Sequence, residues 1–200
     1  SGGIVTCSSS QVFCNGSPTA VVDVTNPITG RTWMDRNLGA SRAAISSTDV
    51  SAYGDLYQWG RGNDGHQCRT SITTTSLSST DQPCSSNFIL SPSSPYDWRS
   101  TQNTNLWQGV NGVNNPCPSG YRLPTETEIN AERLSWSANN DVGAFASPLK
   151  LPVAGYRNLN NGGSLYNVGT VGNYWTSAVR STSSLSLHFV SNAAYMNSNY

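Results

Sequence analysis

Residues 62–116 carry no convincing periodic pattern of apolar residues, and this stretch most limits what the chain can fold into. It is crowded with Ser, Thr, Asn, Gly and Pro, and Trp98 and Trp107 punctuate it. Unstructured stretches of that length are uncommon inside a compact domain and normally serve a purpose. We therefore expect long ordered loops, pinned by the two indoles and by a disulfide between Cys68 and Cys84.

Regular elements are expected on both sides of these loops. The segment "AVVDVTNPITGRTWMDRNLG" alternates around the turn "NPITG", which predicts a β-hairpin ending at Trp33 and Met34. In "TDVSAYGDLYQWGRG", Thr48 or Asp49 can cap a helix of about three turns, because Tyr53, Leu56, Tyr57 and Gly60 recur at helical spacing.

A second helix is predicted from "LPTETEINAERLSWSANN". Thr125 and Glu128 form a capping box, in which each side chain accepts a hydrogen bond from the other residue's backbone N–H. Ile129, Ala131 and Leu134 then give a modest inward stripe. Capping also explains the two carboxylates at Glu126 and Glu128 better than acid–base catalysis does.

The C-terminal third predicts three or more strands, with turns at residues 160–163 and 169–172. In "SSLSLHFVSNAAYMNSNY", Leu185, Leu187 and Phe189 alternate inward, which would turn Ser184, Ser186 and His188 outward. The order of strands, helix, loops, helix and strands predicts an α+β domain with one core.

Five cysteines, at positions 7, 14, 68, 84 and 117, leave one thiol without a mate. None has the CxxC spacing of a zinc or thioredoxin-like site. The loops between Cys7 and Cys14 and between Cys68 and Cys84 are polar and poor in core residues, so a disulfide across each would order a segment that packing alone cannot. This favours Cys7 with Cys14 and Cys68 with Cys84, although other pairings are open. Cys117 is then unpaired within the chain. Residues 1–20 are read as a Ser/Gly-rich arm or linker with a local disulfide, where Asn15 is a sequon if the source glycosylates.

Charge excludes several classes of partner. The 11 basic and 11 acidic residues balance, and Lys150 is the single lysine, so neither nucleic acid nor an acidic membrane surface is an expected partner. No apolar run is long enough to span a membrane. Polarity comes from hydroxyls and amides, and the cysteines favour an exported protein.

The chain contains five motifs in the order "GRTWMDRNLGA", "AYGDLYQWGR", "NPCPSGYRLPTETE", "LKLPVAGYRN" and "GNYWTS". In this order they resemble the Fibrobacter succinogenes major paralogous domain, a bacterial group with a C-type-lectin-like fold. The resemblance covers about residues 21–200. It implies two helices, a twisted and mainly antiparallel sheet, long ordered loops, and pairing of the N- and C-terminal strands.

The resemblance also carries functional expectations. It implies a secreted or surface-displayed protein, on a cell or a virion, without catalytic activity or cofactor. Members usually continue past the "NSNY" position to a "VRC" motif, so the domain at 21–200 would lack its final strand. The mate of Cys117 would lie in that continuation.

Metal and catalytic alternatives are disfavoured by the residues themselves. His66 with Asn63 and Asp64 offers too few carboxylates for a calcium loop, so we expect a solvated turn and no metal site. The Glu-Pro-Asn and Gln-Pro-Asp triplets of sugar-binding C-type lectins are absent, as are GxSxG and HExxH motifs. Core packing is the default role of the six tryptophans, with Trp98 and Trp107 the least certain.

The segment after Trp175 is the favoured ligand-binding region, against the alternative of an ordinary polar strand and loop. Its Ser, Asn, Tyr and His side chains resemble those of adaptable paratopes. The candidate residues are Arg180, Ser184, Ser186, His188, Tyr195, Asn197 and Asn199.

Three functions follow from these observations. The first is an extracellular adhesion module for a protein or glycan. The second is a structural subunit of a filament, pilus or surface layer that self-assembles. The third and least favoured is an oxidase like the formylglycine-generating enzymes, which would need a reactive thiol.

Overall fold

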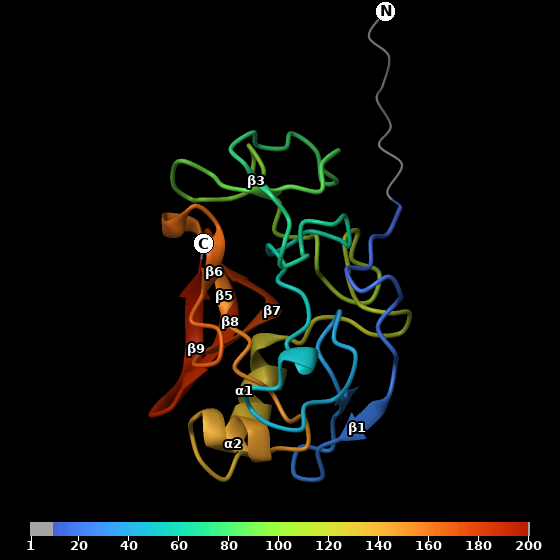
Figure 1. The fold of residues 1–200 in the computed structure, drawn as a ribbon, viewed down its shortest axis with the longest axis vertical. Helices are drawn as coiled ribbons and strands as arrows, with labels where there is room; N and C mark the ends of the chain where they lie inside the picture. The colour runs from blue at the N-terminus through green and yellow to red at the C-terminus, as the bar shows by residue number, and fades with distance from the viewer. Residues whose placement is uncertain (1–9, 200) are drawn as a thin grey trace, which may run out of the picture.

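A computed structural model describes residues 10–199 and contains two α-helices and several small, mostly antiparallel sheets. This confirms an α+β architecture. Figure 1 shows β7 (Gly172–Arg180), β8 (Ser183–Val190) and β9 (Ala193–Asn199) together on one side of the molecule, with β1 (Asp23–Thr25) on the other. Long loops fill the space between them.

The predicted N-terminal hairpin is confirmed. β1 pairs antiparallel with β2 (Thr32–Met34), and Gly30 adopts a left-handed φ of 69° in the turn between them. Asn26 at the start of that turn is buried and donates through Nδ2 to Glu132 Oε2, at 2.7 Å. This hydrogen bond connects the hairpin to the helix that contains Glu132.

Helix α1 (Glu126–Leu134) begins as predicted, since Thr125 and Glu128 form both halves of the capping box. Its inward stripe differs from the prediction, because Leu134 is 67 % exposed whereas Glu132 is fully buried. Glu132 is tolerated inside because it accepts hydrogen bonds from Asn26 and, at 3.4 Å, from Trp136 Nε1.

The predicted helix around residues 48–60 is wrong. Only the 3₁₀ turn η1 (Val50–Ala52) forms, capped by Asp49 as expected. Gly54 then takes a left-handed φ of 68°, which ends the turn, and residues 55–58 have no regular secondary structure. The second helix is instead α2 (Asp141–Ala146), which follows the capping residue Asn140 and was not predicted.

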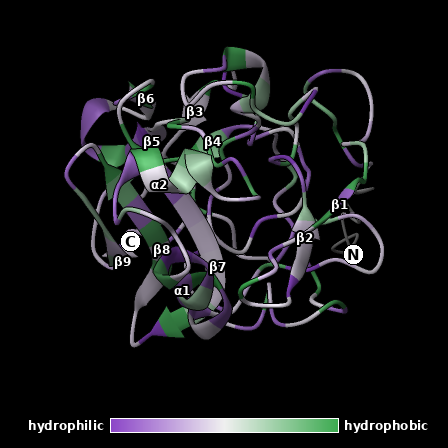
Figure 2. Cartoon of the chain, turned by 90° about the horizontal axis from the view of Figure 1, so that it is seen from below, coloured by the Kyte–Doolittle hydropathy of each residue, from purple (hydrophilic) through white to green (hydrophobic). Residues whose placement is uncertain are grey.

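The main core lies between α1, α2 and one face of the C-terminal sheet. Phe189 is at its centre, with its ring 5.6 Å from the rings of both Trp136 and Tyr174. Leu187 is fully buried beside it, as the alternation predicted. Figure 2 shows hydrophobic and hydrophilic segments alternating along this sheet.

The remaining strands are short. β5 (Tyr156–Asn158) and β6 (Ser164–Tyr166) form a hairpin whose connection includes η2 (Leu159–Asn161), which confirms the predicted turn there. In the 62–116 region, β3 (Thr73–Thr74) and β4 (Phe88–Ile89) pair in parallel. Trp98 and Trp107 are 4 % and 1 % exposed, so both belong to the interior.

The disulfide pairing predicted from loop logic is wrong. Cys14 bonds to Cys68, which excludes both predicted pairs, Cys7–Cys14 and Cys68–Cys84. Cys84 is also disulfide-bonded, Cys117 is a free thiol, and Cys7 lies outside the described residues. Residues of the expected arm are held against the domain, since Val12 exchanges hydrogen bonds with Asn63 and Gln67.

The expected pairing of the N- and C-terminal strands is not found in the described part of the chain. β1 pairs with β2, and β9 pairs with β8 at one end of the three-stranded sheet. No helix within residues 10–199 is long and apolar enough to cross a bilayer.

Candidate functional site

The C-terminal sheet has one apolar and one polar face. Residues directly opposite each other in antiparallel strands share a face. The register places Ser186 between Trp175 and Asn197, and His188 between Asn173 and Tyr195, while Ser184 lies opposite Asn199. Six of the seven predicted ligand-binding residues therefore lie on one face, which we call the polar face: Ser184, Ser186, His188, Tyr195, Asn197 and Asn199.

The polar face is not turned to solvent along its whole length, contrary to the prediction for two of its serines. Ser184 is 8 % exposed and Ser186 is fully buried. The loop at residues 55–59 lies against β7. The indole of Trp175 donates to the Tyr57 carbonyl, and the indole of Trp59 donates to the Thr176 carbonyl, each at 2.8 Å. Part of β7 is therefore in contact with this loop.

Side chains on the polar face hold one another in place. Ser186 Oγ donates to Asn173 Oδ1 at 2.8 Å and accepts from Asn199 Nδ2 at 2.6 Å. Asn197 Nδ2 in turn donates to Asn199 Oδ1 at 3.2 Å. These bonds fix the orientation of the Asn173, Asn197 and Asn199 amides.

Arg180 lies apart from the other predicted residues. It is at the exposed end of β7, where its guanidinium pairs with the carboxylate of Glu126 at 3.0 Å. It does not line the cleft described below. The structure therefore separates Arg180 from the six residues of the polar face.

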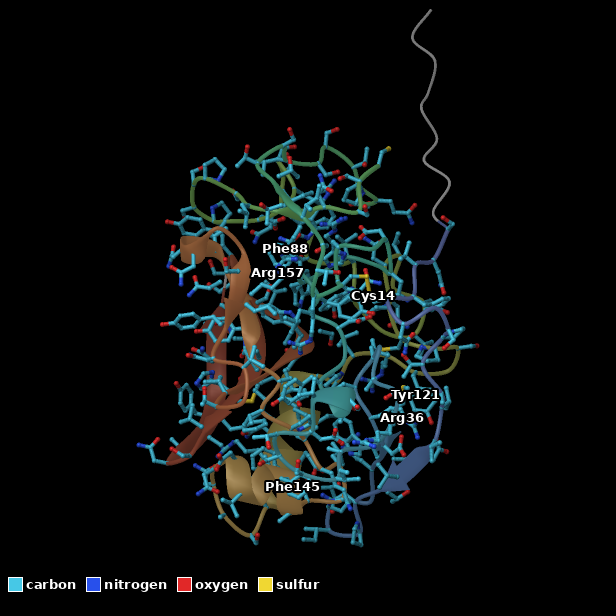
Figure 3. All side chains as sticks on the ribbon, in the orientation of Figure 1. Cys14, Arg36, Phe88, Tyr121, Phe145 and Arg157 are labelled. Atoms are coloured by element: carbon cyan, nitrogen blue, oxygen red, sulfur yellow. A yellow bond between two sulfur atoms is a disulfide. The ribbon has the colours of Figure 1, made fainter. Side chains whose placement is uncertain are left out.

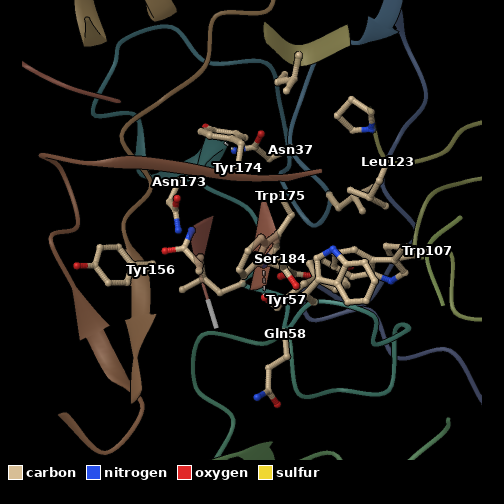
Figure 4. A pocket seen from close by; sticks show the side chains of 18 of the residues that line it. Asn37, Tyr57, Gln58, Trp107, Leu123, Tyr156, Asn173, Tyr174, Trp175 and Ser184 are labelled. Carbon is tan, nitrogen blue, oxygen red and sulfur yellow. Dashed lines mark hydrogen bonds between the residues drawn. The ribbon is translucent and has the colours of Figure 1, made fainter. Parts of the chain in front are cut away.

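A cleft of about 1180 Å³ opens over part of the polar face. Ser184 and Asn199 line it, together with Asn173 and Trp175 of β7. Its walls come from residues 53–59, from Tyr156–Asn160 and from residues 121–124. Figure 4 shows Tyr156 and Asn173 on one side of Trp175, and Leu123 and Trp107 on the other.

The two ends of the cleft differ in character. Around Trp107 the lining is aromatic, with the Trp59 ring 5.5 Å and the Tyr57 ring 6.4 Å from the Trp107 ring. Toward β5 the lining is mixed and includes the amides of Asn158 and Asn160 and the ring of Tyr156. The cleft can therefore hold a ligand that offers both hydroxyls and apolar surface.

Most charged side chains that line the cleft are already engaged. Arg31 and Arg122 both pair with Glu128, at 2.9 and 2.7 Å, and Arg36 pairs with Asp35. The guanidinium of Arg157 lies 4.2 Å from the centre of the Phe88 ring (Figure 3) and donates to Ser71 and Gly163. Arg31 and Arg122 share the single carboxylate of Glu128, and their side chains are 47 % and 36 % exposed.

Asp55 differs from the other charged residues of the cleft. Its burial raises the pKa of its carboxyl to about 7, although the nearby charge of Arg69 opposes the shift. The carboxyl is held against the backbone of Gly39, because a Cβ at position 39 would lie 2.3 Å from the carboxyl carbon. Glycine at position 39 is needed for this close approach.

Cys117 lines the same cleft but is a poor nucleophile. Burial raises the pKa of its thiol to about 12, with a smaller opposing effect from Arg122. A thiol with so high a pKa is almost entirely protonated at neutral pH and therefore unreactive.

The expectation of a solvated turn at His66 is wrong, because the ring is fully buried. Its Nδ1 lies 2.5 Å from Asp64 Oδ1, and its Nε2 accepts from the Gln58 backbone N–H at 2.9 Å. Arg61 is also buried and pairs with Asp64. No cluster of three or more acidic, His or Cys side chains suited to a metal occurs among the described residues.

Sequence reasoning missed Asn173, Tyr156 and Asp55 as lining residues. Asn173 had a readable signal, since it precedes Trp175 by two positions on a strand and so shares its face. Tyr156 and Asp55 come from separate parts of the chain, and only their tertiary contacts bring them to the cleft.

No protein-family model, curated protein or solved structure matches this chain.

Proposed function

We propose that this chain is a non-catalytic binding module, displayed outside the cell or on a virion, that recognises a protein or glycan. The observation that carries the proposal is the polar face, whose pre-oriented amides continue into a cleft of about 1180 Å³. Such a cleft with a few convergent polar groups is the usual form of a binding site. The five motifs that resemble the Fibrobacter succinogenes domain support the same function.

The Cys14–Cys68 disulfide supports an oxidising location, since such bonds persist in extracellular compartments. The protonated state of Cys117 weighs against the oxidase alternative. Titration of the folded protein with a thiol reagent at about pH 7.5 tests this point. We expect no fast-reacting thiol. Rapid labelling of Cys117 would instead support the oxidase alternative.

The binding proposal is tested on an array of immobilised oligosaccharides and purified surface proteins. We expect the wild-type chain to bind a subset of spots, and Asn173→Ala with Asn199→Ala to lose them. Asn192→Ala, in the exposed turn between β8 and β9, is the matched control. Equal binding by the wild-type chain, the double variant and the control would contradict the assignment of the binding site to the polar face and cleft.

A structural subunit is the second candidate, favoured by one observation. Among residues 10–199, β9 pairs with β8 alone and lies at an edge of its sheet, and an edge strand can accept a strand from another chain. Light scattering over a range of concentrations tests self-assembly. A molecular mass that stays monomeric at high concentration would contradict this alternative.

A further inference from the structure

Arg31 and Arg122 give one wall of the cleft an excess of positive charge. Both arginines line the cleft, and both pair with the single carboxylate of Glu128. That carboxylate also accepts a hydrogen bond from the Thr125 backbone N–H. Its hydrogen bonds with Arg122 lower the pKa of Glu128 to about 2, so it is ionised at neutral pH. One carboxylate therefore balances two guanidinium groups.

The two guanidinium groups keep donors for a ligand. A guanidinium has five N–H groups. Arg31 uses one of them on Glu128, and Arg122 uses three on Glu128 and the Leu123 carbonyl. The others have no hydrogen-bond partner among residues 10–199, and both side chains are partly exposed. An anionic group can therefore gain charge-assisted hydrogen bonds here while the pairs with Glu128 persist.

The other carboxyls that line the cleft lie near arginines of their own. Asp55 is near Arg69, and Asp97 is near Arg99. These two carboxyls therefore do not provide the missing counter-charge.

Two further carboxylates lie outside the cleft near the same wall. Glu126 pairs with Arg180 at 3.0 Å, and that pair is neutral. Asp23 accepts a hydrogen bond from the Tyr121 hydroxyl, and its exposure to water weakens its attraction for distant cations. The excess positive charge inside the cleft therefore remains.

A second cation lies on the wall formed by β5. Arg157 lines the cleft and has no carboxylate partner among residues 10–199. Its guanidinium donates instead to Ser71 and to the Gly163 carbonyl. A ligand with repeated anionic groups can pair with both walls at once, and linked contacts strengthen each other.

Neutral lining groups suit the rings and hydroxyls of a sugar. Asn158 and Asn173 each use the side-chain oxygen in a hydrogen bond, which leaves the NH₂ group as a donor. The Tyr156 ring lies on the same side of Trp175 as Asn173 (Figure 4). Sugar hydroxyls accept hydrogen bonds from amides, and the C–H faces of a sugar pack on aromatic rings.

We propose that the cleft binds a uronic-acid oligosaccharide, with one carboxylate on Arg31 and Arg122 and another near Arg157. The sugar hydroxyls accept from the Asn158 and Asn173 amides. A carboxylate matches the planar donor geometry of a guanidinium. An acidic peptide would bring carboxylates without the ring hydroxyls. The inference rests on the proposed binding function and assigns its ligand class.

Calorimetric titration with matched oligomers tests the ligand class. The probes are hexamers of galacturonate, mannuronate and hyaluronan, the methyl esters of these hexamers, and hexaglutamate. EDTA is present throughout, so that calcium cannot bridge carboxylates. We expect at least one uronate hexamer to bind, and its methyl ester and hexaglutamate to bind at least about tenfold more weakly. Sodium chloride at about 0.5 M should weaken uronate binding, because salt screens exposed charges.

Variants locate the carboxylate. Arg31→Gln and Arg122→Gln remove a charge but keep an amide, and each should weaken binding about tenfold, the effect of one charge-assisted hydrogen bond. Arg42→Gln is the matched control. Arg42 also pairs with a carboxylate, its side chain is 50 % exposed against 47 % for Arg31, and it does not line the cleft. Near-ultraviolet circular dichroism checks that each variant is folded.

Failures at different steps have different meanings. If no uronate hexamer binds, or if the methyl esters or hexaglutamate bind as tightly, the ligand class is wrong. Equal binding by Arg31→Gln, Arg122→Gln and Arg42→Gln overturns the carboxylate site. If the array shows a ligand that is lost in Asn173→Ala with Asn199→Ala while no uronate hexamer binds, the proposed function stands and this inference is wrong. If neither experiment shows binding, both are wrong.

Discussion

Asp55, which is half-buried, and His66, which is fully buried, affect the pH dependence of stability in opposite directions. Burial raises the pKa of Asp55 to about 7 and lowers the pKa of His66 to about 4. In the unfolded chain the pKa of Asp is about 3.9 and the pKa of His is about 6.5. Between these values the native state holds an extra proton at Asp55 and lacks one at His66.

The Asp55→Asn variant separates the two effects. The Asp55 pKa is higher in the folded state, so its contribution to stability falls as pH rises from about 4 to about 7. The His66 pKa is lower in the folded state, so its contribution rises from about pH 4 to about 6.5. Urea unfolding at about pH 4.5, 6 and 8 should show a steeper rise with pH in Asp55→Asn than in wild type. Parallel curves would contradict the assignment.

At the scale of an element, α1 depends on its first turn. Thr125→Ala removes the side-chain oxygen that accepts from the Glu128 N–H, so we expect a loss of about 1 kcal/mol in the free energy of unfolding. Thr127→Ala is the matched control, since Thr127 is exposed and lies inside the helix. Equal effects of the two substitutions, measured in urea, would mean that the cap is unimportant.

The packing of β7 against β8 depends on a glycine. A side-chain carbon at Gly172 would lie 2.1 Å from the Phe189 ring, so Gly172→Ala must displace the central core residue. We expect a cost of about 1–3 kcal/mol, the usual range for overpacking. At Gly62 the nearest atom would be 3.8 Å away, so Gly62→Ala should be tolerated. Thermal unfolding of both variants compares them, and similar midpoints would argue against the steric account.

For the whole molecule, the Cys14–Cys68 disulfide joins the N-terminal segment to the loops, across a sequence separation of 54. Loss of this cross-link in Cys14→Ser with Cys68→Ser should lower the free energy of unfolding by about 2–4 kcal/mol, since the unfolded chain gains freedom. Cys117→Ser, which breaks no disulfide, should have a smaller effect. An unchanged urea midpoint in the double variant would contradict a stabilising role.

Features that depend on neighbouring residues could be predicted from the sequence. The hairpin at "NPITG", the capping box at Thr125 and the alternation of Leu185, Leu187 and Phe189 all follow from local geometry, and all appear in the structure. The same alternation grouped Ser184, Ser186 and His188 on one face, and the register of β8 with β9 adds Tyr195, Asn197 and Asn199 to it. The periodicity of apolar residues and the capping of a helix depend on residues that are close in the sequence, so both can be predicted from the sequence alone.

What covers each face depended on contacts between distant parts of the chain. Gly54 takes a left-handed φ where a helical pattern was predicted, and hydrogen bonds from Trp175 and Trp59 hold the irregular segment after it against β7. Disulfide pairing likewise depended on which loops meet in space, and Cys14 met Cys68. The cleft joins residues from several separate regions of the chain, and such long-range contacts leave no periodic mark in the sequence.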